Sequence, residues 1–272
     1  MKALFNDNII DNNLTIELNN RALQFGDGLF ETIITHKTKV QLLNLHFDRL
    51  MNGGRVLSLN VNLTLSELEH KIISVIEANG VETYNRIKLI VWRGNEAQKG
   101  YYSGSNQAEI LITSKPSVKP EIRIIEKASF SKNVRLIHHS FSALKTLSAL
   151  PYVMASHERE KRAFDELILC DGQGNISECV SSNIFWIDGN HIYTTSLDTG
   201  CVAGVMRQHI IKQLAEQGIS VKKVVIQKDQ FLKAEFIFST NVAGVGIIKS
   251  IDDQSYETEN ELFDKIKRLL VL

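Results

Sequence analysis

The sequence has no long apolar run and no excess of charge of either sign. No segment approaches the roughly 18 consecutive apolar residues that a membrane-spanning helix needs. The N-terminal MKALFNDNII has one lysine and no sustained apolar stretch, so we expect no signal peptide. Thirty-one basic residues balance 31 acidic ones, which excludes a global field that attracts nucleic acid or anionic membrane. These absences predict a cytoplasmic enzyme or small-molecule binding module.

Cysteine is also scarce. Cys170, Cys179 and Cys201 have no metal or redox spacing, and their odd number fits a reducing compartment. The pairs His138-His139 and His157-Glu158 match no metal-binding motif, so we expect no metal.

The chain has three prolines, and two of them lie between Lys115 and Pro120. Because proline fixes φ and removes a donor, this segment predicts an extended linker. We therefore expect a small domain over residues 1–115, a linker over 116–120 and a larger domain over 121–272. Strands and helices mix without strict βαβ alternation, which predicts the α+β class.

Local patterns predict several elements around this boundary. Residues 28–36 and 39–43 form a strand pair, and residues 45–52 form a helix that Gly53-Gly54 interrupts. A capping box starting at Ser66 opens a second helix, and Pro151 opens a third.

Glu178 stands in ISECVSSNIFW (176–186), between a turn and an apolar strand. A glutamate at a strand end is usually solvated. Here the short hydrogen-bonding residues 181–183 follow it, and a carboxylate held among them could keep a proton on the ring nitrogen of an electron-sink cofactor. The residues alone leave both interpretations open.

Lys145 lies in SALKTLSAL, with no other charge for several residues on either side. Such a lysine either reaches the surface or is desolvated with a lowered pKa. A desolvated lysine supplies a neutral amine that can form a Schiff base or act as a general base.

Two further features suit an anion. A glycine-flanked turn, Gly200–Gly204, enters an amphipathic helix whose first turn has no acidic residue, so the N–H groups of Val205 and Met206 could bind phosphate. Arg49 lies on the apolar side of its helix and needs an anion or a salt bridge. An ordinary helix start and an ordinary salt bridge are the alternatives.

Together these features resemble the class IV aminotransferases, the fold-type IV enzymes that use pyridoxal 5′-phosphate. The family signature runs from a glutamate through an asparagine and an aromatic residue to a threonine and a final G-x-x-[KR]. It is met here by Glu178, Asn183, Phe185, Thr194, Gly204 and Arg207. Val180 departs from the signature, because that position usually holds a smaller residue. The resemblance extends from about Arg21 to Ile248.

The resemblance implies a role for each candidate. Lys145 would form the Schiff base and move the proton at the substrate's α-carbon, while Glu178 would pair with the pyridinium nitrogen. The phosphate would be held by Arg49, Val205, Met206 and either Thr240 or Asn241, and the pocket would be lined by Ser181, Ser182 and Asn183. A small α/β domain, a larger pseudo-barrel domain and a homodimer are also implied.

Within the family, residues 21–32 and 144–147 are most similar to the 4-amino-4-deoxychorismate lyases, which implies formation of 4-aminobenzoate and pyruvate for folate synthesis. An aminotransferase acting on branched-chain or D-amino acids with 2-oxoglutarate is the alternative. A non-catalytic binding module is a third, but it would not need the Lys145 and Glu178 pair.

The same resemblance implies substrate contacts at Phe30, Arg93, Lys99 and Tyr101. D-amino-acid aminotransferases tend to have tyrosine where Phe30 stands and an R-x-H trap that residues 93–102 do not reproduce. Branched-chain aminotransferases carry tyrosine five residues past the lysine, where Leu150 stands. The lyases have Arg-Gly-Tyr in place of residues 99–101, and a lysine lacks the bidentate fork of arginine.

Overall fold

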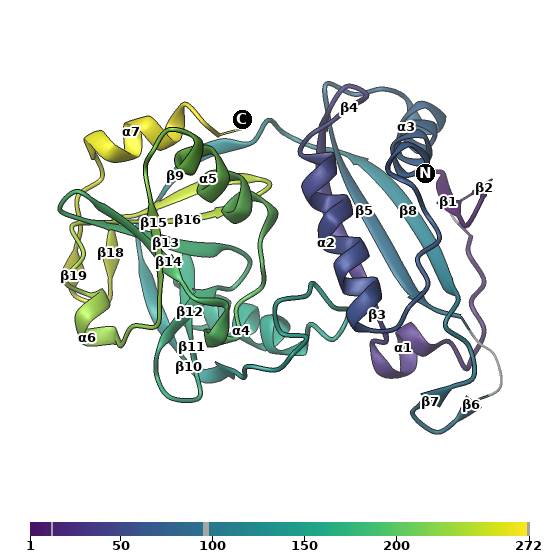
Figure 1. Cartoon of the computed structure of the whole chain (residues 1–272), viewed down its shortest axis with the longest axis horizontal. Coiled ribbons are helices and arrows are strands. Elements are labelled where there is room, and N and C mark those ends of the chain that lie inside the picture. Colours follow the sequence, from purple (N-terminus) through teal and green to yellow (C-terminus); the bar gives the residue numbers. More distant parts are fainter. Residues whose placement is uncertain (12, 95–97, 271–272) are drawn as a thin grey trace. The chain divides into compact units, whose positions relative to one another are not determined.

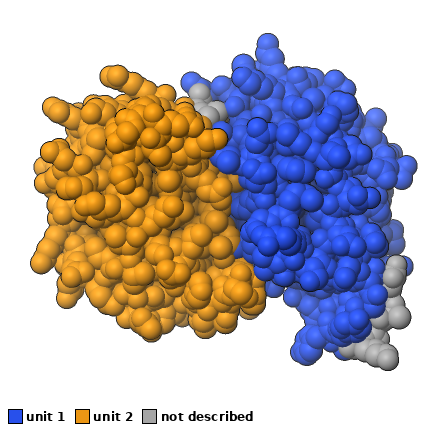
Figure 2. Space-filling view, in the orientation of Figure 1, with its two compact units in different colours: residues 1–119, 144–149 blue, residues 120–143, 150–272 orange. Residues whose placement is uncertain are grey.

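The computed structural model describes residues 1–11, 13–94 and 98–270, without the side chains of Gln98 and Lys99. The chain divides into two compact units (Figure 2). Unit 1 comprises residues 1–119 and 144–149, and unit 2 comprises residues 120–143 and 150–272. Sheets and helices occur in both units, which confirms the predicted α+β class.

Unit 1 contains a six-stranded antiparallel sheet in the order β2-β1-β8-β5-β3-β4. Its strands are β1 (Ala3–Phe5), β2 (Asn8–Ile10), β3 (Gly28–His36), β4 (Lys39–Val40), β5 (Tyr84–Arg93) and β8 (Ala108–Pro116). Residues 145–147 lie beside the start of β3. There the Phe30 N–H donates to the Lys145 carbonyl, and the Leu147 N–H donates to the Gly28 carbonyl, both at 2.9 Å. These bonds explain why a segment distant in sequence belongs to unit 1.

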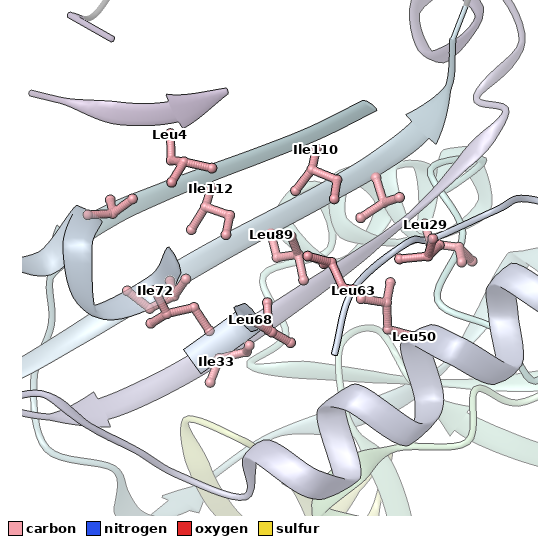
Figure 3. Packing of buried hydrophobic residues seen from close by; sticks show 14 of the residues in the cluster. Leu4, Leu29, Ile33, Leu50, Leu63, Leu68, Ile72, Leu89, Ile110 and Ile112 are labelled. Atoms are coloured by element: carbon pink, nitrogen blue, oxygen red, sulfur yellow. The ribbon is translucent and has the colours of Figure 1, made fainter. Parts of the chain in front are cut away.

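Helices α2 (Leu43–Val56) and α3 (Leu65–Asn79) pack their apolar side chains against one face of this sheet. Figure 3 shows part of this core, which includes Leu29, Ile33, Leu50, Leu68, Ile72 and Leu89. Because side chains alternate along a strand, Phe30 and Lys88 point to the other face of the sheet. Both are half-buried there.

Helix α2 continues through Gly53 and Gly54, so the predicted interruption at these residues is wrong. A Cβ on Gly53 would lie 2.6 Å from Leu29 Cδ1, and one on Gly54 would lie 3.0 Å from the Leu59 carbonyl oxygen. The two glycines therefore allow close packing of the helix rather than ending it.

Unit 2 contains two mixed sheets, with orders β12-β11-β10-β18-β19 and β15-β14-β13-β16-β17-β9 (Figure 1). Their strands are β9 (Glu121–Ile125), β10 (Ala128–Leu136), β11 (Glu166–Asp171), β12 (Ile176–Cys179), β13 (Asn183–Asp188), β14 (His191–Thr195), β15 (Val221–Val224), β16 (Phe236–Asn241), β17 (Gly244–Ile248), β18 (Ser250–Ile251) and β19 (Gln254–Ser255). Side chains of both sheets share one apolar core, which includes Phe130, Ile168, Ile184, Trp186 and Ile237.

Helices α4 (Leu150–Lys161) and α5 (Val205–Glu216) are the longest of unit 2 within the part of the chain that the structure describes. The shorter elements of the two units are α1 (Arg21–Phe25), η1 (Leu197–Thr199), α6 (Lys228–Phe231), α7 (Glu261–Lys267) and the hairpin of β6 (Gln98–Lys99) with β7 (Tyr102–Ser103). Among the described residues, no helix is long and apolar enough to cross a membrane.

Candidate active site

Glu178 lies on β12, where it pairs with Leu169 of β11. Its exposed fraction is 3%, so the solvated alternative for this carboxylate is excluded. A buried carboxylate needs hydrogen bonds or a charged partner, because burial alone favours its neutral form.

Three neutral donors bind the Glu178 carboxylate. The Tyr152 hydroxyl donates to Oε1 at 2.6 Å, the Val202 N–H donates to Oε1 at 3.1 Å, and Asn183 Nδ2 donates to Oε2 at 3.2 Å. Donors of this kind stabilise the ionised form of a carboxylate. The negative charge also acts on a neighbour, since burial and then Glu178 raise the pKa of Cys201 to about 11.

Asn183 fixes the loop that leads into α5. Its Nδ2 also donates to the Val202 carbonyl at 2.8 Å, and a Cβ on Gly204 would lie 1.9 Å from its Oδ1. Residue 204 therefore has to be glycine for the loop to close on Asn183. Helix α5 then begins with no acidic residue in its first turn and no side-chain cap. The N–H groups of Val205 and Met206 lie at this positive end of the helix dipole.

Thr240 is the strand partner of Asn183, on β16. Its side chain is 1% exposed, and within the described part of the chain its Oγ1 has no hydrogen-bond partner. The next residue, Asn241, donates from Nδ2 to the Ser181 carbonyl at 3.1 Å and to Ser182 Oγ at 3.0 Å. A buried hydroxyl without a partner is costly, and an anion such as phosphate would satisfy it.

In unit 1, two amines lie over the Phe30 ring. The Nζ of Lys145 is 4.4 Å and the Nζ of Lys88 is 3.3 Å from the ring centroid. Burial and the positive charge of Lys145 lower the pKa of Lys88 to about 8, although Glu31 opposes the shift. The face of the sheet to which Phe30 and Lys88 point, opposite the helix-covered face, therefore presents an aromatic surface with two neighbouring cations.

Arg49 forms a buried ion pair on the helix-covered face. Its Nε donates to Glu31 Oε1 at 2.7 Å, its Nη2 donates to Oε2, and His46 Nδ1 lies 2.7 Å from Oε2. Burial raises the pKa of Glu31, but the Arg49 charge and the hydrogen bonds outweigh it and hold the pKa at about 2. Burial lowers the pKa of His46, so the neutral ring donates to Glu31. The salt bridge considered for Arg49 is present, and its phosphate contact stays a prediction.

Each guanidinium nitrogen of Arg93 donates within the protein. Nε donates to Asp27 at 3.0 Å, Nη1 to the Ser58 carbonyl at 2.9 Å and to Asn106 Oδ1 at 3.0 Å, and Nη2 to the Leu57 carbonyl at 2.7 Å. These contacts give no support to its predicted substrate role.

The other two predicted substrate residues lie near the β6–β7 hairpin. Tyr101 is exposed, its ring packs against Phe25 at 5.4 Å between centroids, and its carbonyl accepts from Arg21. Lys99 lies in β6, but its side chain is outside the described residues.

Unit 2 thus brings most predicted cofactor residues into one connected set, and unit 1 brings Phe30 and Lys145 together. Three residues were missed: Glu31, Lys88 and Tyr152. Lys88 lies on the same strand face as Phe30, and Glu31 follows Phe30 directly, so strand alternation and the need of Arg49 for an anion could have indicated both. No local pattern indicates Tyr152.

The described residues contain no cluster of potential metal ligands.

Comparison with known proteins identifies the family of the chain. Residues 28–251 match the family model of class IV amino-transferases. D-alanine aminotransferase from Bacillus licheniformis is 25% identical over 260 residues, which cover 94% of this chain and 90% of the relative. Aminodeoxychorismate lyase from Bacillus subtilis is 26% identical over 219 residues, which cover 80% and 74%. A branched-chain aminotransferase structure from T.th., complexed with N-(5′-phosphopyridoxyl)-L-glutamate, matches with a TM-score of 0.85 at 21% identity, covering 98% of this chain and 92% of that one.

Proposed function

The chain belongs to the class IV aminotransferases, enzymes of fold-type IV that use pyridoxal 5′-phosphate, and we propose that it is a 4-amino-4-deoxychorismate lyase. The products would be 4-aminobenzoate and pyruvate, which serves folate synthesis. The observation that carries this choice is the pair of amines, Lys145 and Lys88, over the Phe30 ring.

The residues of unit 2 fit the cofactor. The buried carboxyl group of Glu178, which accepts from three neutral donors, suits a protonated ring nitrogen. The uncapped start of α5 and the unpartnered hydroxyl of Thr240 suit its phosphate. When bound, the cofactor withdraws electrons from the substrate carbon that carries the amine.

Lys145 is the proposed proton carrier. Its amine takes the proton from the ring carbon that bears the amino group, and the C–O bond to the enolpyruvyl group on the adjacent carbon then breaks. The six-membered ring becomes aromatic, and the departing enolpyruvate takes up a proton and tautomerises to pyruvate. General acid–base catalysis of this kind contributes about 10²- to 10⁴-fold to a rate.

Phe30 and Lys88 supply recognition. The substrate is a cyclohexadiene ring with two carboxylates, and an aromatic face beside a cation complements both features. Lys88 would bind the substrate carboxylate in place of Arg93, because the guanidinium nitrogens of Arg93 bind Asp27 and backbone carbonyls. The half-buried position of Lys88 strengthens a charge–carboxylate contact relative to one in water.

An aminotransferase acting on branched-chain or D-amino acids is the second candidate. The identity to D-alanine aminotransferase, 25%, is close to the 26% shared with the lyase and favours neither. An amino acid with an aliphatic side chain, however, offers no ring to the face of Phe30. The lyase substrate offers a ring for Phe30 and a carboxylate for Lys88.

The deciding experiment compares two assays on the purified holoenzyme. In the first, 4-amino-4-deoxychorismate alone is supplied, and release of 4-aminobenzoate is expected. In the second, D-alanine or leucine is supplied with 2-oxoglutarate, and glutamate is measured. Glutamate formation without any 4-aminobenzoate would refute the lyase. Lys145→Ala is the blank for both assays.

We further propose that the protein is a cytoplasmic homodimer. Four exposed apolar side chains in unit 1, Leu23, Phe25, Tyr101 and Tyr102, support an interface between two copies. The three cysteines are buried free thiols, which supports a reducing compartment. Sedimentation of the wild-type holoenzyme as a monomer at micromolar concentration would refute the dimer.

A further inference from the structure

We infer that Tyr152 is a positioning residue that keeps Glu178 ionised and oriented for the cofactor's ring nitrogen. The inference rests on the cofactor role of Glu178 proposed above. It goes beyond that role because it states that the contact between Glu178 and the ring nitrogen owes its strength to the phenol of Tyr152 on α4 and not to the carboxylate alone.

The phenol ring is held firmly. Tyr152 stands in the first turn of α4 and packs against an apolar cluster formed by Val134, Leu136, Ala155, Leu167, Leu169 and Val180. This packing fixes the direction of the hydroxyl before any ligand arrives. The hydrogen bond to Glu178 therefore costs little additional side-chain entropy.

Tyr152 makes the shortest of the three hydrogen bonds to Glu178 described above. Its oxygen lies 2.6 Å from Oε1, compared with 3.1 Å for the Val202 nitrogen and 3.2 Å for Asn183 Nδ2. An O–H group that donates to a carboxylate at this distance makes a strong, charge-assisted bond. Burial and the negative charge of Glu178 raise the pKa of Tyr152, so the phenol remains a donor across the working range of pH.

The consequence for Glu178 follows from its burial. A carboxylate that is 3% exposed and loses the shortest of its three described hydrogen bonds shifts toward its neutral, protonated form. A protonated carboxyl no longer accepts from a cationic ring N–H with the strength of a charge pair. Tyr152 would thus act on the ring nitrogen through Glu178 without touching the cofactor.

The test uses the apoprotein and two probes, pyridoxal 5′-phosphate and its deaza analogue, in which CH replaces the ring nitrogen. Wild-type protein should bind pyridoxal 5′-phosphate at least about 10-fold more tightly than the analogue, because the analogue cannot form the hydrogen bond to the charged group. In Tyr152→Phe this ratio should fall to within about 2-fold at neutral pH, and lower pH should reduce it further.

Tyr256→Phe is the matched control. Tyr256 also belongs to unit 2, and its hydroxyl donates to the Leu232 carbonyl at 3.3 Å. This variant should keep the wild-type ratio. If the ratio falls equally in both variants, loss of any buried phenol is the cause and the inference is wrong.

A second measurement does not depend on the cofactor or on the folding of Tyr152→Phe. Infrared difference spectra between the wild-type apoprotein and Glu178→Gln should show an ionised carboxylate at neutral pH, and a protonated acid there would overturn the inference. The inference would also be overturned if Tyr152→Phe binds pyridoxal 5′-phosphate and keeps the wild-type ratio of affinities for pyridoxal 5′-phosphate and the deaza analogue. A wild-type protein that binds both probes equally would instead refute the role of Glu178 proposed above.

Discussion

The two units each bury a carboxylate, and they hold it in different ways. In unit 1, Glu31 receives a bidentate guanidinium from Arg49 and a neutral His46, so its charge is cancelled within the group. In unit 2, the hydrogen bonds described for Glu178 come from Tyr152, Val202 and Asn183, which are all neutral donors.

The difference separates stability from function. Removing one member of a cancelled buried pair leaves an uncompensated charge, which is strongly destabilising. A carboxylate stabilised by neutral donors keeps its charge and its orientation for a cationic ligand. We therefore expect Glu31 to stabilise the fold around Arg49, and Glu178 to have the cofactor role proposed for it above. The following variants test this contrast, from the largest expected effect to the smallest.

Lys145→Ala should lower turnover by about three orders of magnitude or more, because it removes the proposed proton carrier. It should also abolish the visible absorption of the holoenzyme. The cancelled charges of Glu31 and Arg49 should be unaffected, so the urea midpoint of the apoprotein should stay near that of the wild type. Lys115→Ala, at an exposed lysine of β8, is the control. Turnover retained within about 10-fold of the wild type would contradict the role of Lys145.

Glu31→Gln should destabilise the apoprotein by about 3–5 kcal/mol, because Arg49 then lies buried without its counter-charge. Glu178→Gln should cost only about 1 kcal/mol, since Tyr152 and Val202 can still donate to the amide oxygen. Urea unfolding of both apoproteins measures the difference. Equal losses of stability in the two variants would remove the contrast between the units.

The pH dependence of unfolding sharpens the same contrast. The pKa of Glu31 lies at about 2 in the folded protein, below its ordinary value of 4.5. A lowered folded pKa contributes stability that is complete above pH 4.5 and is lost as the pH falls toward 2. At about 1.4 kcal/mol per pKa unit, this loss is about 3 kcal/mol. Glu31→Gln should lack this part of the acid transition, and an unchanged acid transition in the variant would contradict it.

Lys88→Gln should raise KM by about 10- to 100-fold with a smaller change in kcat, because a charge–carboxylate contact of about 1.5–3 kcal/mol is lost. Lys88→Arg should restore part of the binding. In the wild type, KM should rise above pH 8, since the pKa of Lys88 is about 8 and the cation is lost there. A flat KM across the range from about one pH unit below this pKa to one unit above it would argue against this contact.

Thr240→Val should have the smallest effect and act in opposite directions on stability and binding. The variant removes a buried hydroxyl that lacks a partner within the described chain, so the apoprotein should be unchanged or up to about 1 kcal/mol more stable. The affinity for pyridoxal 5′-phosphate should fall several-fold. A fall in apoprotein stability would show that the hydroxyl is satisfied by the protein.

Local sequence patterns predicted much of unit 2. The helix near Pro151 and the amphipathic helix after Gly204 both form. Turns, caps and amphipathic periodicity are written in consecutive residues, so they can be read without the fold. Even so, the capping box of α3 is formed by Thr64 and Glu67 and does not start at Ser66. Both starting positions satisfy the capping-box pattern, and packing selects one of them.

The sequence by itself determined which groups are available: a lysine among apolar residues, a glutamate before a polar cluster, and a glycine turn into a helix without acidic residues in its first turn. Only the tertiary structure decided their partners. Arg49 meets Glu31 across 18 residues, and Glu178 meets Tyr152 across 26. Such pairs form because strands and helices bury their apolar faces first, and the polar groups carried inward must then satisfy one another.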